Sequence, residues 1–133
     1  LSLHDALPIW FGSGSANVTN GTGKIHILWQ GVGDSWLTST STFNDNEWYH
    51  FALVREGNTF TMYVNGAREA TDTQSGEFNL DIGSGVRLGK SEWDGANGFF
   101  SGQISQLRIT VGNARYSGAG FVIPDNYFPG KNA

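Results

Sequence analysis

Two loops of this 133-residue sequence hold the residues best suited to chemistry. The segment KSEWDGANG places Trp93, Asp94 and Asn97 close together, and the turn GVGDS places Asp34 two residues before Trp36. An exposed indole ring beside amide and carboxylate groups suits a sugar site, where the ring stacks on the sugar and the polar groups bind its hydroxyls. We therefore predict ligand binding by Trp93, Asp94, Asn97 and Trp36. The alternative is that Trp93 anchors its loop by folding onto the domain.

The same aspartates are candidates for a metal site. Ca²⁺ is bound by carboxylates and loop carbonyls, and Asp94 and Asp34 lie in loops rich in glycine. The alternative is that each aspartate caps its turn through its own backbone. No two histidines have the spacing of zinc ligands, and the chain has no cysteine. The sequence thus suggests calcium at Asp94 and Asp34, or no cofactor at all.

The acidic residues give little support for catalysis. Glycoside hydrolysis needs two carboxylates, about 5 Å apart for retention and further apart for inversion. The glutamates are isolated and lie mostly beside turns, so we interpret them as solvated: Glu47, Glu56, Glu69, Glu77 and Glu92. A Ser/His/Asp triad around His50 is the other catalytic option, but His50 and His26 both lie in strand-forming segments, where packing is the commoner role. We therefore expect no enzyme.

Composition excludes other classes of partner. The net charge is −4, from 12 acidic and 8 basic residues, and no run of Lys or Arg occurs. Binding to nucleic acid would need a basic stripe, so we expect none. Apolar runs of only a few residues are too short to span a membrane. The 19 glycines and 5 tryptophans favour short strands joined by tight turns.

The elements that must position these residues are predicted to be mainly β-strands. The pair Asn65-Gly66 predicts a hairpin turn, so the region 48–71 is expected to form a three-stranded meander. Period-two alternation places Phe60, Met62 and Val64 on one face of their strand. The predicted strands are 10–11, 25–29, 35–42, 48–55, 59–64, 67–71, 80–82, 86–88 and 103–111.

No segment of ten or more residues has helical periodicity with caps. Many short strands with turns every few residues predict an all-β, antiparallel sandwich. The segment Gln103–Val111 (QISQLRITV) alternates cleanly and is expected to be one of its strands. We also expect Trp48 and Trp29 to be core or half-buried residues.

Three ordered motifs resemble one family. They are WYHFALVR with the later YVNG, then VRLG, then FSGQISQLRIT, followed by NARY and the final FP. Together they resemble laminin-G-like domains of the concanavalin A-like jelly-roll type, including those of phage tail, virion and bacterial surface proteins. The resemblance implies that Arg115 and Tyr116 fix the carboxy-terminal segment, and that amino-terminal strands are absent. Ser105 departs from the pattern, because the family often has Asp there.

The first nine residues, LSLHDALPI, resemble a translated sequencing adapter. We therefore predict a leader over 1–9 that is non-native or disordered, and one sandwich domain over 10–133. The expected function is a non-enzymatic module that binds glycans or another surface ligand on a phage tail, virion or cell surface. The alternative is an architectural domain that binds neighbouring virion subunits or further copies of itself.

Overall fold

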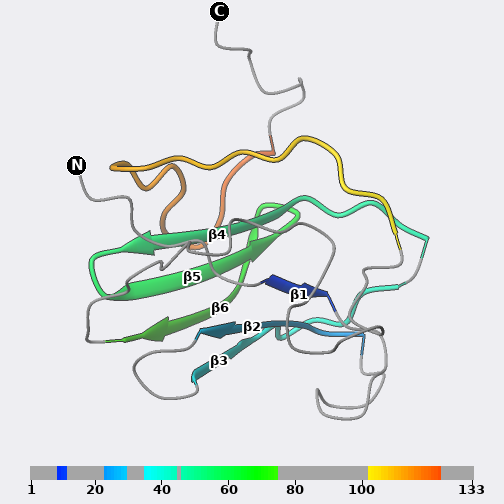
Figure 1. The fold of residues 1–133 in the computed structure, drawn as a ribbon, viewed down its shortest axis with the longest axis horizontal. Coiled ribbons are helices and arrows are strands. Elements are labelled where there is room, and N and C mark those ends of the chain that lie inside the picture. Colours follow the sequence, from blue (N-terminus) through cyan, green and yellow to red (C-terminus); the bar gives the residue numbers. More distant parts are fainter. Residues whose placement is uncertain (1–8, 12–22, 30–34, 45, 75–101, 124–133) are drawn as a thin grey trace, which may run out of the picture.

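The computed structural model describes residues 9–11, 23–29, 35–44, 46–74 and 102–123. Within these ranges every regular element is a β-strand, and the strands form two three-stranded antiparallel sheets (Figure 1). The prediction of an all-β antiparallel fold is confirmed for this part of the chain. The described residues contain no helix of the length and apolarity needed to cross a membrane.

The first sheet has the order β1-β2-β3. Its strands are β1 (Ile9–Phe11), β2 (Ile25–Trp29) and β3 (Ser35–Thr38). Ile25 and Ile27 are buried, as expected for alternate positions of a strand with one face on the core. The pairing of β2 and β3 continues past β3, where the Ser39 amide donates to the Ile25 carbonyl over 2.9 Å.

The second sheet has the order β4-β5-β6 and is the predicted meander. Its strands are β4 (Phe51–Glu56), β5 (Thr59–Val64) and β6 (Ala67–Thr73). The Asn65-Gly66 turn has φ values of 49° and 78°, the left-handed conformation that such a pair tolerates. The sequence prediction is therefore confirmed for β5 and its hairpin.

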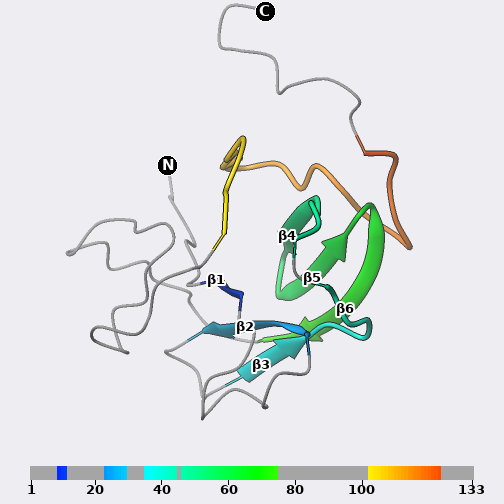
Figure 2. The same cartoon turned by 90° about the vertical axis from the view of Figure 1, so that its right-hand side faces the viewer.

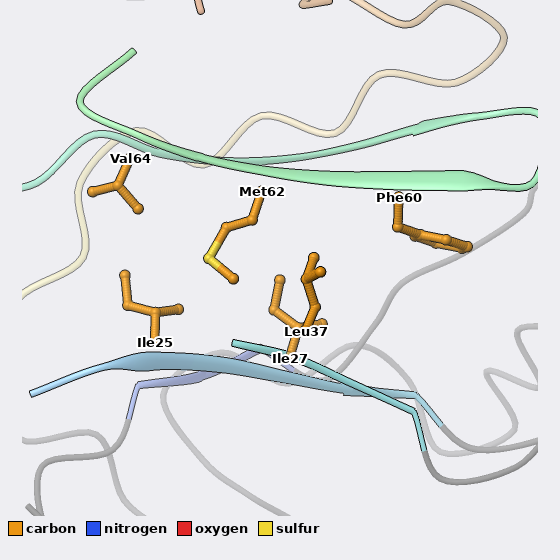
Figure 3. Packing of buried hydrophobic residues seen from close by; sticks show 6 residues of the cluster. All are labelled: Ile25, Ile27, Leu37, Phe60, Met62 and Val64. Atoms are coloured by element: carbon orange, nitrogen blue, oxygen red, sulfur yellow. The ribbon is translucent and has the colours of Figure 1, made fainter. Parts of the chain in front are cut away.

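The core lies between the two sheets (Figure 2). Side chains from β2 and β3 point toward side chains from β5 (Figure 3). The buried cluster consists of Ile25, Ile27, Leu37, Phe60, Met62 and Val64. Because β5 alternates, its other face carries Tyr63, which is also buried. Burial of each such side chain contributes about 1.5–3 kcal/mol relative to exposure.

The two sheets are also joined along one edge by hydrogen bonds. Glu69 of β6 accepts, through Oε2, a hydrogen bond from the Ser41 amide over 2.8 Å. The Thr40 hydroxyl donates to the Glu69 carbonyl. Glu69 occupies a bulge of β6 opposite Met62 and Tyr63. The interpretation of Glu69 as merely solvated is therefore wrong, because its carboxylate holds the loop that follows β3.

The segment 102–123 crosses the side of the second sheet that faces away from β1–β3 (Figures 1 and 2). Residues 103–111 form no strand, so the strand predicted for Gln103–Val111 is wrong. Gln106 has a φ of 56°, which interrupts the extended backbone that alternation alone would predict. The later part is held to the sheet by an antiparallel bridge between Ala67 and Gly120.

Candidate functional site

Most of the residues predicted to bind a ligand or calcium lie outside the part of the chain that the structure describes. These are Trp93, Asp94, Asn97 and Asp34. Trp36 belongs to β3, where its backbone is opposite Leu28 of β2. The predictions for all five residues therefore stay predictions.

The described part contains a different candidate, Trp48, whose side chain is 66 % exposed. Our expectation that Trp48 is a core or half-buried residue is wrong. The predicted strand begins at Trp48, whereas β4 begins at Phe51. Tyr49 and Phe51 pack against the core cluster, and alternation along an extended chain then directs Trp48 away from it. The indole is thus presented to solvent just before the strand starts.

The residues beside Trp48 form a polar rim, which we define as Asn44, Asn46, Glu47, Trp48 and Tyr49. The Tyr49 hydroxyl donates to Oε2 of Glu47 over 2.6 Å, and it accepts a hydrogen bond from the Asn44 amide over 3.0 Å. Asn46, with a φ of 62°, makes the turn that allows this closure. The Tyr49 phenol therefore joins Asn44, at the start of the rim, to Glu47.

Two further contacts fix the position of Tyr49. Its ring meets the Phe43 ring edge to face, with centroids 5.0 Å apart, and the Phe43 amide donates to the Gly23 carbonyl over 2.7 Å. The hydrogen bond to the Glu47 carboxylate raises the pKa of Tyr49 above its ordinary value, because loss of the phenol proton would place two negative charges side by side. Tyr49 therefore stays protonated as the rim's anchor at neutral pH.

Two residues after Trp48, His50 is fastened to the β5–β6 turn. The His50 amide donates to Oδ1 of Asn65 over 2.9 Å, and the Asn65 amide donates to the His50 carbonyl over 2.8 Å. Because Tyr49 and His50, the two residues that follow Trp48, are anchored, the backbone of Trp48 is held in place although its ring is exposed.

The His50 ring packs within an aromatic cluster. It meets the rings of Phe121 and Tyr116 edge to face, at 5.5 and 6.3 Å between centroids. Phe121 in turn stacks on Tyr116 and covers Tyr63. Tyr116 thus fixes the carboxy-terminal segment as the sequence resemblance implied, and His50 has the packing role that we predicted.

Three acidic side chains that the structure describes are each engaged singly. Glu47 contacts Tyr49, Glu69 contacts Ser41, and Asp72 accepts hydrogen bonds from the Thr73 amide and the Gln74 side chain. Among the described residues, no three or more His, Asp or Glu side chains are grouped as a metal site would require. The groups that the structure describes on the rim can form hydrogen bonds and can stack against a ring.

Sequence reasoning missed the rim because Trp48 opened an apolar strand pattern. The signal that could have found it is the preceding polar turn FNDNE, since a turn residue such as Asn46 resets the alternation that follows it.

Comparison with known proteins assigns the family. Residues 7–112 match a laminin-G family model that is described as the concanavalin A-like lectin/glucanases superfamily. The chain belongs to this family, whose fold is a jelly roll. No curated protein and no solved structure matches it.

Proposed function

We propose that this domain is a non-enzymatic module that binds glycans or another surface ligand as part of a phage tail, virion or bacterial surface protein. The observation that carries the proposal is Trp48, an exposed indole held on a polar rim of a lectin-like sandwich. Large aromatic side chains exposed beside hydrogen-bonding groups are typical of sites that recognise sugars. The similarity of the segment RITVGNARY to phage tail and surface proteins supports this setting.

Two features favour binding over hydrolysis. A glycoside hydrolase places two carboxylates about 5–10 Å apart across the scissile bond. Glu47, Glu69 and Asp72 instead each hold a nearby backbone or side-chain group. A catalytic triad would orient its histidine through a carboxylate. Within the described residues, Nδ1 of His50 is buried and has no hydrogen-bond partner, which supports a packing role over that of a base.

The experiment is a glycan array probed with the wild-type protein, with Ca²⁺ and again with chelator. We expect binding to at least one glycan and no hydrolysis of it. Loss of binding with chelator would support calcium at Asp94 and Asp34, and Trp93→Ala would test the KSEWDGANG loop. A silent array would contradict the proposal, as would release of cleaved sugar.

One observation favours the architectural alternative, in which the domain binds neighbouring subunits or other copies. Large apolar side chains along the segment 102–123 are 45–90 % exposed. They are Ile104, Leu107, Ile109, Val111 and Val122. Exposed apolar patches of this kind mark protein interfaces. The alternative predicts self-association in light scattering that is weakened by Ile109→Ser, whereas monomeric behaviour at high concentration would count against association with itself.

A further inference from the structure

We infer that the rim around Trp48 is itself a sugar-binding site, and that its ligand is a neutral pyranose rather than an acidic sugar. This inference rests on the proposed function and deepens it. It assigns the site to the turn before β4 and the residues that follow it, and not to the KSEWDGANG loop.

The first argument is the exposure of Trp48 in a rigid setting. An exposed indole offers a flat apolar face, and the apolar C–H face of a pyranose ring can stack on it. Such a platform binds well only if it loses little freedom when the ligand arrives. The backbone of Trp48 meets this condition, because Tyr49 and His50, the two residues after it, are tied by hydrogen bonds and ring contacts to the rest of the sandwich.

The second argument is the polar chemistry of the rim. Glu47 uses Oε2 to accept the Tyr49 hydroxyl, and within the described residues its Oε1 has no partner. A carboxylate oxygen on the surface is a strong acceptor for a sugar hydroxyl. Asn44 and Asn46 are also exposed, and each side-chain amide can donate as well as accept. Adjacent hydroxyls of one sugar ring require such a combination of acceptor and donor groups.

The third argument is charge, and it selects the class of sugar. The charged group that the structure describes on the rim is the carboxylate of Glu47, and the sequence has no Lys or Arg between Lys24 and Arg55. A sialic or uronic acid carboxylate brought to the rim would meet the like charge of Glu47. Neutral hexoses and N-acetylated hexosamines carry no such penalty.

The test is an array of neutral and acidic oligosaccharides, followed by titration calorimetry with the strongest neutral binder. We expect Trp48→Ala to weaken binding roughly tenfold or more, as for a central aromatic contact. Trp48→Phe should retain part of the affinity. Glu47→Gln, which keeps the shape of the side chain but removes its charge, should weaken binding less than Trp48→Ala.

Two readouts separate a binding role from a structural one. Thermal unfolding of Trp48→Ala should match that of the wild type, because the indole is exposed. Ligand should also change the tryptophan fluorescence of the wild type, and that change should shrink in Trp48→Phe. Trp93→Ala is the competing variant: loss of binding in it, with binding retained in Trp48→Ala, would move the site to the KSEWDGANG loop.

The outcomes distinguish failure of the Trp48 site from failure of the proposed glycan-binding function. A silent array overturns both the site and the proposed function. Array binding that survives Trp48→Ala overturns the site alone and leaves the function standing. A strongest binder that is acidic overturns the assignment of sugar class.

Discussion

The meander β4–β6 and the segment 103–111 both alternate apolar with polar residues, yet they have opposite fates. In the meander, Phe60, Met62 and Val64 are buried against the other sheet. In the segment, Leu107, Ile109 and Val111 are 45–64 % exposed and no strand forms. Alternation sorts side chains onto two faces, but a strand also needs a partner that pairs its amides and a layer that covers its apolar face. The meander obtains both from a tight turn and from β2 and β3.

The largest effect should come from emptying the buried face. Phe60→Ala is expected to destabilise the domain by about 3–5 kcal/mol, because it leaves a cavity lined by neighbours that cannot fully collapse. Urea denaturation followed by circular dichroism measures this free energy of unfolding. The matched control is Ile109→Ala in the segment, which should change stability by no more than about 0.5 kcal/mol. Equal losses in the two variants would show that the two regions are packed alike.

A smaller effect should come from the point where the two regions meet. Gly66 has a φ of 78°, and a Cβ there would lie 2.3 Å from the Phe121 carbonyl oxygen. Gly66→Ala should therefore lower the free energy of unfolding by about 1–2 kcal/mol, because alanine disfavours the left-handed backbone. The loss should be larger in total, because the Phe121 backbone must also move to make room for the methyl group.

Gly57→Ala is the control for this substitution, since Gly57 has a φ of 61° but no atom within 4 Å of the position that the alanine methyl carbon would take. It should carry the backbone cost alone. Thermal unfolding compares the two variants, and NMR contacts between the Tyr116 and Phe121 rings report on the segment. Identical melting temperatures, or unchanged ring contacts in Gly66→Ala, would contradict the coupling between meander and segment.

The smallest effect concerns pH at the rim. The Glu47 hydrogen bond raises the pKa of Tyr49, so the contact stabilises the folded state while the phenol is protonated. That contribution is complete below the ordinary tyrosine pKa and is lost as pH rises through the higher folded value. Glu47→Gln should bring the pKa of Tyr49 down. NMR of the tyrosine ring carbons measures the pKa of Tyr49, and Tyr49→Phe assigns its signal. The same pKa in Glu47→Gln and in the wild type would contradict the hydrogen bond between Glu47 and Tyr49.

The sequence predicted those parts of the fold that are determined by residues close together along the chain. The strands 25–29 and 59–64 match β2 and β5 in their bounds, because β-branched and aromatic residues fill them and turn residues flank them. The Asn65-Gly66 turn was predictable for the same reason, since few residue pairs accept its backbone. The family motifs predicted that these strands belong to a jelly roll. Residues 7–112 match the family that has this fold.

What could not be predicted depends on distant contacts. The exposure of Trp48 follows from where β4 starts, and that start is set by the bonds of His50 to Asn65, fifteen positions later. The role of Glu69 depends on Ser41, which lies 28 positions earlier. The apolar pattern of 103–111 gives no sign of the left-handed Gln106. Each of these needs the assembled sandwich.

The paired hydrogen bonds between His50 and Asn65 have a consequence for how long the rim keeps its shape. The amides of Asn44, His50 and Asn65 all donate to protein acceptors, although none belongs to a strand. Exchange of such amides with solvent deuterium requires local opening, and two of them open only if the β5–β6 turn separates from the residue before β4. The amides of His50 and Asn65, which border the rim, should thus exchange on the slow timescale of the sheet rather than the fast timescale of a surface loop.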